Sequence, residues 1–297
     1  MTAKGRYDKL KSDRSAFLNI ARAASDLTLP YLIRGEEDLM KGAHTLVTPW
    51  QSVGAKGVVT LSAKLMLALL PPNTSFFKLQ INDAELGTTE LPPEIRSDLD
   101  LAFAKVERMI MDDIAASDER VVVHQALKHL IVGGNALLFM GPKGLKMYPL
   151  NRYVVDRDGD GNVIEIVTKE RVSKKLIKNF YPDYKELEPT PNEVSGGGGL
   201  NGAYTDQDEC DIYTHVTMKG KKWVWYQEVD GKPLKGSESS APLDTSPWIV
   251  LVMNHVDGEN YGRGRVEEYI GDLKSLEALS QALVEGSAAA AKVVFTV

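Results

Sequence analysis

The chain has 297 residues, of which 43% are hydrophobic and 26% charged, as in a folded globular protein with a core of its own. Its formal net charge of −6 excludes the strong positive field of a protein that wraps nucleic acid. The single cysteine, Cys210, excludes a disulfide within the chain and favours assembly in a reducing compartment. The charged N-terminal residues lack the apolar core of a signal peptide, and no apolar run is long enough to cross a bilayer, so we expect no membrane partner.

The first part of the chain is predicted to be helical. Apolar residues at three- and four-residue spacing over residues 7–27 indicate an amphipathic helix. Residues 48–72 predict a second helix. Thr48 suits its N-cap, the proline that follows suits its first turn, and a pair of prolines ends it.

A short strand is predicted at residues 74–82, and two further helices are expected at about 93–116 and 118–132. A pair of prolines opens the first of these helices, and two glycines end the second. The apolar positions of the 93–116 helix that we expect to be buried are Leu99, Phe103, Val106, Ile110 and Ile114.

After residue 134 the pattern changes from helical to strand-like. The strand-like segments are 135–150, 153–172, 211–229 and 247–256. They are rich in β-branched and aromatic residues and are divided by turns that contain glycine, which indicates an antiparallel sheet built from hairpins. Residues 188–209, rich in Pro, Gly and Ser, predict a flexible surface loop. Helices, then hairpins, then a long helix at 263–291 predict an α+β fold class.

The stretch DRDGDGNVIE, residues 156–165, looks like the opening of an EF-hand calcium loop. Gly161 stands at the sixth loop position, but the twelfth position holds Val167, and Glu165 comes two residues too early to be the bidentate ligand. The flanking residues alternate as strands do, and Asp-Gly and Gly-Asn favour tight turns. We predict a hairpin turn here, with a calcium-binding module as the alternative.

The remaining candidate motifs supply no catalytic or metal site. His124 and His129 are five residues apart on one predicted helix, so their rings do not share a face. Cys210 has no neighbouring base, and glycines 196–199 lack the Lys-Ser/Thr of a phosphate loop. The stretch KGKKW at 219–223 could grip nucleic acid, but a hairpin tip with solubilising lysines is favoured. We expect no enzymatic activity, no metal and no cofactor, and nothing supports a hydrolase with a nucleophile outside this sequence.

The final helix, 263–291, carries an apolar stripe on one face and charges on the opposite face. The stripe consists of Val266, Tyr269, Ile270, Leu273, Leu276, Leu279 and Leu283. Gly286 and a run of alanines follow, and such small residues allow a neighbouring backbone to approach closely. The pattern favours side-by-side packing with copies of the same helix, although an ordinary core helix of a larger domain explains it as well.

Several stretches resemble, in the same order, the portal proteins of T7-like short-tailed bacteriophages, also called head-to-tail connectors. The most specific is TPWQSVGAKGVVTLSAKLMLALLPP at 48–72. The others are VERMIMDDI (106–114), ALKHLIVGGNALLF (126–139), YPLNRYVVDRDGDGNVIEIVTKE (148–170), DIYTHV (211–216) and DGENYGRGRVEEYIGDLKSLEALSQALVEGS (257–287). The resemblance spans nearly the whole chain, with the loop at 188–209 as the main exception.

The resemblance implies a portal-type fold. Residues 1–262 would form a wing-like α+β domain, 263–291 the first stem helix, and 292–297 the start of a clip. Because family members are considerably longer, we expect the rest of the clip, a second stem helix and a crown to be missing from this sequence. Its abrupt end, AAAAKVVFTV, agrees with that expectation.

The resemblance also implies a virion protein that forms a ring, usually of twelve copies, at one capsid vertex, through which genomic DNA is packaged and ejected. The implied partners are major capsid and scaffolding proteins, the terminase, tail adaptor and tail proteins, and double-stranded DNA bound without sequence specificity. During assembly the protein would be in the host cytoplasm. The resemblance implies no catalytic site, because the packaging ATPase is a separate terminase.

A channel that lets DNA slide should make few tight phosphate contacts, because each Lys or Arg contact adds affinity. Residues 263–292 carry four basic and five acidic side chains, a mixture that suits passage. We expect Lys292 to touch DNA only transiently and the stripe residues to pack against neighbouring subunits. Another head–tail assembly factor, such as a tail adaptor, is the alternative.

Overall fold

The computed structural model of the chain describes residues 2–34, 46–72, 74–80, 92–181 and 209–292. The α-helices are α1 (Ala3–Asp26), α2 (Val53–Leu69), α3 (Pro93–Ala116), α4 (Glu119–Gly133), α5 (Lys174–Phe180) and α6 (Ile270–Ala291). The strands are β1 (Asn135–Gly141), β2 (Gly144–Tyr148), β3 (Tyr153–Arg157), β4 (Val163–Ser173), β5 (Glu209–Lys219), β6 (Lys222–Val229), β7 (Lys232–Pro233), β8 (Ser239–Pro242) and β9 (Trp248–Val252). Short 3-10 turns are η2 (Leu150–Arg152), η4 (Leu243–Thr245) and η5 (Arg265–Tyr269).

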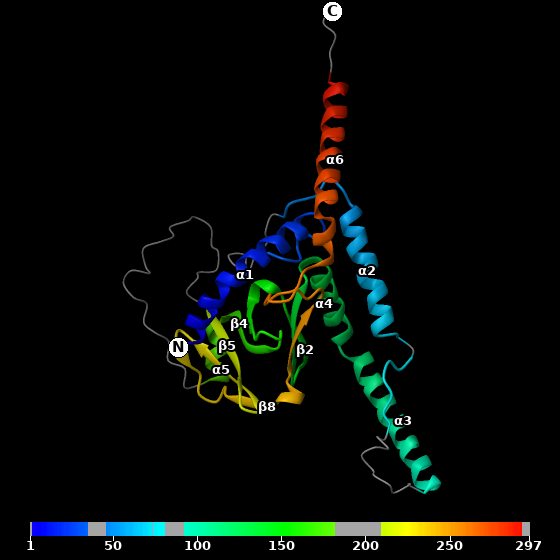
Figure 1. Cartoon of the computed structure of the whole chain (residues 1–297), viewed down its shortest axis with the longest axis vertical. Coiled ribbons are helices and arrows are strands. Elements are labelled where there is room, and N and C mark those ends of the chain that lie inside the picture. The colour runs from blue at the N-terminus through cyan, green and yellow to red at the C-terminus, as the bar shows by residue number, and fades with distance from the viewer. Residues whose placement is uncertain (1, 35–45, 73, 81–91, 182–208, 293–297) are drawn as a thin grey trace, which may run out of the picture.

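Two antiparallel sheets form the centre of the molecule (Figure 1). The smaller has the order β2-β1-β9, and the larger has the order β3-β4-β5-β6-β7, with β8 paired to β6. Each described strand pair is antiparallel, and neighbours along the chain are mostly joined as hairpins. Helices precede and follow this hairpin region, so the predicted α+β class is confirmed.

The main hydrophobic core lies where α1 and α4 meet the sheets. It contains Leu18 from α1, Ile131 from α4, Leu137 from β1 and Ile166 from β4, together with Tyr261 from the segment before η5. Each of these side chains is less than about one-tenth exposed. Burying one leucine or isoleucine side chain contributes about 1.5–3 kcal/mol relative to leaving it exposed, so this cluster fixes α1, α4 and the sheets as one body.

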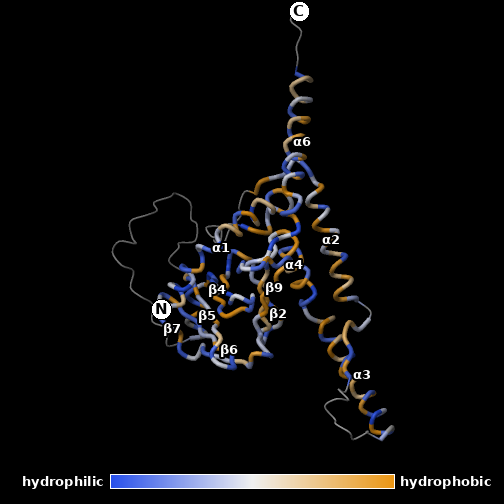
Figure 2. Tube along the Cα trace, viewed as in Figure 1, coloured by the Kyte–Doolittle hydropathy of each residue, from blue (hydrophilic) through white to orange (hydrophobic). Residues whose placement is uncertain are grey.

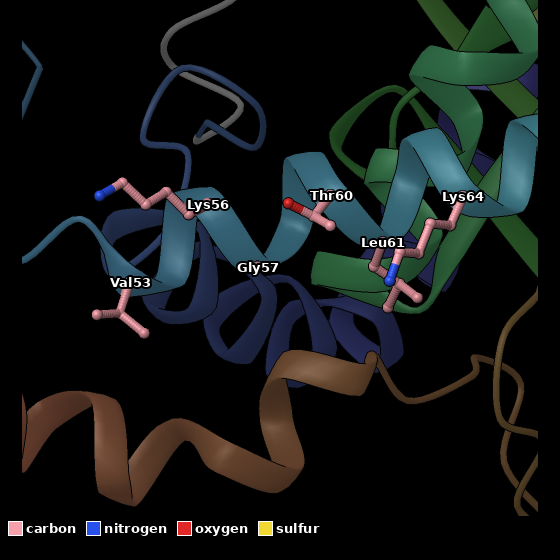
Figure 3. Close-up of a pocket in the computed structure, with 6 residues that line it drawn as sticks. All are labelled: Val53, Lys56, Gly57, Thr60, Leu61 and Lys64. Atoms are coloured by element: carbon pink, nitrogen blue, oxygen red, sulfur yellow. The ribbon is translucent and has the colours of Figure 1, made fainter.

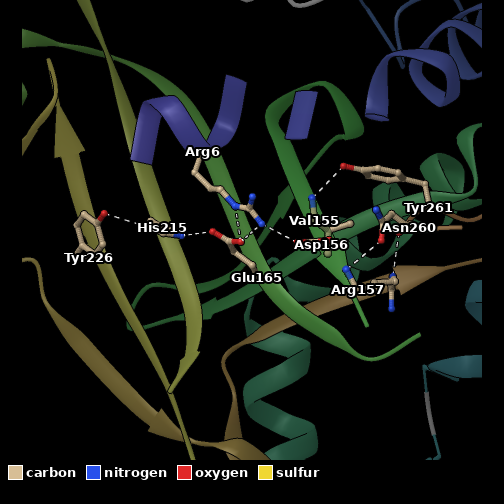
Figure 4. Close-up of polar contacts among 9 residues, drawn as sticks. All are labelled: Arg6, Val155, Asp156, Arg157, Glu165, His215, Tyr226, Asn260 and Tyr261. Atoms are coloured by element: carbon tan, nitrogen blue, oxygen red, sulfur yellow. Dashed lines mark hydrogen bonds and ion pairs between the residues drawn. The ribbon is translucent and has the colours of Figure 1, made fainter. Parts of the chain in front are cut away.

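Helix α1 is also fixed to the larger sheet by charged groups (Figure 4). Arg6 Nε donates a hydrogen bond to Glu165 Oε2 at 2.7 Å, and Arg6 Nη2 lies 2.7 Å from Asp156 Oδ2. On the other side of the same carboxylate, His215 Nε2 lies 2.5 Å from Glu165 Oε1. Burial raises the pKa of Glu165, but the hydrogen bonds from His215 and Arg6 outweigh it and lower that pKa below its usual value.

The predicted start of the second helix is wrong, because α2 begins at Val53 instead of Thr48. The side chain of Gln51 supplies the cap: the Gly54 N–H donates to Gln51 Oε1 at 2.9 Å. The prediction of a strand at 74–82 is also wrong for the described residues 74–80, which pair with no strand. There the Leu79 N–H donates to Glu107 Oε1 of α3 at 2.5 Å.

The bounds of α3 and α4 agree with the predicted helices to within one residue. The predicted burial of α3 is wrong. Val106 is 43% and Ile110 37% exposed, and Leu99, Phe103 and Ile114 are only half-buried. The reason is visible in Figure 1, where α3 extends away from the sheets and contacts little besides the start of α4.

The long C-terminal helix begins later than predicted. Helix α6 starts at Ile270, and residues 265–269 before it form the 3-10 turn η5. The helix then projects away from the body (Figure 1). The predicted loop at 188–209 lies outside the described residues except for Glu209, which begins β5, and residues 293–297 also lie outside them.

Candidate functional site

The apolar stripe predicted on the C-terminal helix divides into two parts in the structure. Val266 is buried in η5, and Ile270, Leu273 and Leu276 are half-buried against the body. Tyr269, Leu279 and Leu283 are 49%, 69% and 72% exposed. From Gln281 to Lys292 every residue is exposed. The first turns of α6 therefore anchor the helix, and its distal half presents apolar side chains to solvent.

The anchor of α6 is a polar junction with the segment that leads into α2. The Trp50 N–H donates to Glu277 Oε1 at 2.8 Å, and the Gln51 N–H to Glu277 Oε2 at 3.3 Å. Gln51 Nε2 donates to the Leu27 carbonyl at 2.7 Å, which ties the same segment to the end of α1. At Gly54 a Cβ atom would come within 2.6 Å of the Leu27 carbonyl oxygen, so only glycine fits there.

An apolar groove of about 390 Å³ lies between α2 and the η5–α6 segment. Val53, Gly57 and Leu61 of α2 line one side, and Tyr269, Leu273 and Leu276 line the other. The groove adjoins a hollow of about 440 Å³ on the outer face of α2 (Figure 3). Val53, Lys56, Gly57, Thr60, Leu61 and Lys64 line that hollow.

The charges at the base of α6 neutralise one another. Arg263 Nη2 lies 2.5 Å from Glu259 Oε1, and Arg263 Nη1 lies 2.9 Å from Glu267 Oε1. Arg265 Nη1 lies 3.2 Å from Glu268 Oε2. The hydrogen bond to Glu259 raises the pKa of Arg263 above its usual value. Arg263 and Arg265, the basic residues near η5, are thus ion-paired with carboxylates. Lys292, by contrast, is the exposed C-cap residue at the far end of α6.

The DRDGDG stretch forms the predicted hairpin turn between β3 and β4, with Tyr153 opposite Thr168 in the ladder. The Asp158 carboxylate accepts hydrogen bonds from the N–H groups of Asp160 at 3.0 Å and Asn162 at 2.7 Å. Gly161 has a φ of +81°, which glycine adopts without strain. Asp158 therefore closes the turn and does not point towards a shared ligand position. Within the described ranges, no group of three or more His, Cys, Asp or Glu is placed to hold a metal ion.

The other sequence candidates have structural positions. His129 is 5% exposed inside the helical core, and burial lowers its pKa to about 4. His124 Nε2 lies 3.2 Å from Ser62 Oγ of α2, so the two histidines face different surroundings. Cys210 is buried on β5, and residues 219–222 form the predicted hairpin tip between β5 and β6. Glycines 196–199 lie outside the described residues.

Sequence reasoning missed Glu277 as the residue that joins α6 to the segment before α2, and it missed the open face of α2. The sequence did contain one indication of the open face, since α2 contains Lys56 and Lys64 but no acidic residue. The junction left no comparable signal, because the carboxylate and the N–H groups that it binds are more than two hundred residues apart. In the parts of the chain that the structure covers, no helix is both long and apolar enough to cross a membrane.

Known proteins resemble this chain over nearly its whole length. A family model described as bacteriophage head to tail connecting protein matches residues 1–297. The chain is 38% identical over 300 residues to the portal protein of Enterobacteria phage T3, which covers 98% of this chain and 53% of that protein. It is 36% identical over 300 residues to the portal protein of Escherichia phage T7, with the same shares covered, 98% and 53%.

The portal protein of Enterobacteria phage SP6 is more distant, at 29% identity over 294 residues, with 98% of this chain and 54% of that protein covered. The chain thus spans about half the length of the curated relatives that it matches. The family model covers the chain from end to end, and two relatives exceed 30% identity over nearly all of it. The chain belongs to the family of bacteriophage head-to-tail connecting proteins.

Proposed function

We propose that this chain is a subunit of a ring-forming portal, the connector at one capsid vertex through which the phage genome is packaged and ejected. The observation that carries the proposal is the distal half of α6. Leu279 and Leu283 are 69% and 72% exposed on a helix that stands clear of the body. The exposed distal part, residues 281–292, is short enough to be marginal in water unless an apolar face packs on a partner. Copies of the same helix, arranged side by side around a ring of about twelve subunits, would supply that partner.

The regions of the chain correspond to the parts of a portal subunit. Residues 1–262 would be the wing, and the η5–α6 segment within 263–291 the first stem helix. Residues 292–297 would begin the clip. The Glu277 junction and the half-buried Leu273 support this division, because they fix the direction in which α6 leaves the body. The exposed Tyr269, Leu279 and Leu283 would contact neighbouring subunits.

The role we propose is structural and not enzymatic. The channel would conduct double-stranded DNA without sequence specificity, and other surfaces would bind capsid and scaffolding proteins, the terminase, the tail adaptor and tail proteins. The protein would be found at a capsid vertex in the virion, and in the host cytoplasm during assembly. Arg263 and Arg265 pair with carboxylates of the same chain. This pairing supports a channel in which DNA slides without being bound tightly, because paired guanidinium groups attract phosphates weakly.

Lys292 would touch the passing DNA transiently. It is the exposed C-cap of α6, and within the described residues it lies at the tip of the projecting helix. Replacement of Lys292 by Gln in the full-length protein should change the rate of DNA packaging or ejection while rings still form. Unchanged packaging would remove Lys292 from the channel contacts.

The ring itself is tested by measuring particle mass by mass photometry and shape by negative-stain imaging, both on the full-length protein. We expect rings of about twelve subunits with an axial hole. A protein that stays monomeric at all concentrations, and in the presence of scaffolding protein, would contradict the proposal.

A further inference from the structure

About half of the large exposed apolar side chains of the described structure lie on three helices. On α2 they are Val53, Val59, Leu67 and Leu69; on α3, Ile95, Leu101, Val106, Met109 and Ile110; on α6, Leu279, Leu283 and Val284. Figure 2 shows these helices along one edge of the molecule, away from the centre of the sheets. Clustered apolar surface of this kind marks an interaction site. Packing of α6 on its copies would cover only the third group, so α2 and α3 need a partner as well.

The α2 face, defined as Val53, Lys56, Gly57, Thr60, Lys64 and Leu67, is exposed at every position. These residues recur every three or four positions and therefore lie on one side of the helix. At its middle, a Cβ atom on Gly57 would meet nothing within 4 Å, and the hollow of about 440 Å³ opens there. The face carries two lysines, and α2 contains no acidic residue. It is an open, largely apolar surface with a lysine on either side of Gly57 (Figure 3).

The α3 row, defined as Ile95, Asp98, Ala102, Val106, Met109 and Asp113, is also exposed at every position. Its spacing of three and four residues forms a continuous ridge along the helix. Val106 and Met109 are 43% and 67% exposed at its centre. The row carries two carboxylates and no base. Lys105 follows Asp98 by seven residues and therefore lies beside it on the same exposed side of α3, which leaves this side with a net negative charge, whereas Arg108 lies on another side.

We propose that the α3 row of one copy packs on the α2 face of the next copy around the ring. The occupant is thus a second copy of this chain, and the inference rests on the ring proposed above. The ridge is apolar and acidic, whereas the hollow is apolar and basic, so shape and charge are complementary. The two surfaces are different patches of one chain, and a contact between different patches closes into a ring when the rotation is right. The two helices would approach each other most closely at Gly57, because glycine has no side chain to fill the space there.

Cross-linking tests the contact directly. The full-length protein with Gly57→Cys and Met109→Cys is treated with a short bis-maleimide after assembly. The native cysteine, Cys210, is buried at 8% exposure. The wild-type protein, treated in the same way, shows whether Cys210 reacts. We expect a ladder of covalent multimers on a denaturing gel, because each copy offers both cysteines to different neighbours. A mixture of the two single variants should stop at dimers. The pairing would be overturned if rings of the double variant gave no ladder. It would also be overturned if Met109→Cys alone gave dimers.

Two further variants keep the test independent of cross-linker geometry. Gly57→Leu fills the hollow without a clash inside the chain, so its thermal unfolding should match wild type while the ring fraction falls at least tenfold. The matched control is Ser15→Leu on the exposed side of α1, which should assemble normally. Lys56→Glu with Lys64→Glu should also block assembly, and adding Asp98→Lys with Asp113→Lys should restore it. Normal assembly of Gly57→Leu, or no rescue by the charge exchange, would overturn the contact.

The outcomes separate this contact from the ring itself. If the wild-type full-length protein forms no rings, the proposed function fails. If wild-type rings form and the cross-linking ladder is absent, only the pairing of α2 with α3 fails, and the portal assignment stands.

Discussion

The Ala3 N–H, at the first turn of α1, donates a hydrogen bond of 2.7 Å to the carboxylate of Glu228 on β6, 225 residues away. The Lys4 N–H donates to the other oxygen of that carboxylate at 3.1 Å. Glu228 is only 1% exposed. The first N–H groups of a helix lack partners within the helix and carry a partial positive charge, so a buried carboxylate placed there is satisfied. One glutamate of the sheet thus fixes the end of the N-terminal helix.

Replacement of Glu228 by Ala should destabilise the fold by about 1–3 kcal/mol, because two backbone N–H groups lose their acceptor in a buried position. Urea unfolding followed by circular dichroism measures the change. The control is Glu238→Ala, at an exposed position in the loop before β8. Equal unfolding midpoints for the two variants would show that Glu228 does not hold α1.

Buried His129 should make the fold sensitive to mild acid. Its pKa is lowered to about 4 by burial, whereas an unfolded histidine titrates near pH 6.5. Below pH 6.5 the unfolded chain therefore binds a proton that the folded chain refuses. The stabilising contribution is complete above pH 6.5, and about 3 kcal/mol of it is lost as the pH falls towards 4.

His129→Leu should remove this dependence, since leucine has a similar size and no titratable group. The measurement is the urea midpoint at several pH values between 4 and 7 for wild type and variant. His124→Leu is the comparison, because His124 is half-buried and burial lowers its pKa without a large shift. Parallel curves for wild type and His129→Leu would contradict the prediction.

Glu165 should control stability in a more acidic range. Its folded pKa is lowered by His215 and Arg6 despite burial, so its contribution is complete above the ordinary glutamate pKa of about 4.3. The contribution is lost as the pH falls through the folded pKa, because protonation breaks the contacts of Figure 4. Glu165→Gln should therefore be less stable than wild type at pH 7 and almost equal to it at pH 2–3. A constant difference at all pH values would exclude this role.

Gly264 should tolerate no side chain. A Cβ atom there would lie 2.4 Å from the Val132 carbonyl oxygen, and backbone cannot move aside as a flexible side chain can. We expect Gly264→Ala to cost about 1–3 kcal/mol through overpacking. Gly271→Ala in α6 is the matched control, because a Cβ atom there meets nothing within 4 Å. That change should stabilise the helix by up to about 1 kcal/mol. Thermal unfolding of the two variants decides, and equal melting temperatures would refute the clash.

The exposed leucines of α6 should matter for assembly and not for the fold of one subunit. Leu279→Asn with Leu283→Asn removes apolar groups that are 69% and 72% exposed, so the free energy of unfolding of the monomer, measured with urea, should change by less than about 1 kcal/mol. The ring fraction in mass photometry should fall sharply. Leu176→Asn, on α5 and 47% exposed, should alter neither quantity. Intact rings in the double variant would exclude this stripe from the subunit contact.

The sequence by itself determined several of the local elements, although it misplaced the starts of α2 and α6. Periodicity and punctuation by proline and glycine located α3 and α4 to within a residue, and they predicted the β3–β4 and β5–β6 hairpins. The same local rules favoured a hairpin turn over a calcium loop at 156–165, because turn chemistry depends on neighbours in the chain. The order of motifs along the chain also indicated the family.

The tertiary structure alone decided which apolar faces are buried. The stripe of α3 has the pattern of a core helix, yet α3 extends from the body and leaves Val106 and Ile110 exposed. The stripe on α6 is buried at Val266 and exposed at Leu283 although its pattern is continuous. Periodicity reports that a face is apolar but not what covers it, because the covering residues come from distant parts of the chain. For the same reason the acceptors of the Ala3 and Trp50 N–H groups, Glu228 and Glu277, could not be predicted from local sequence.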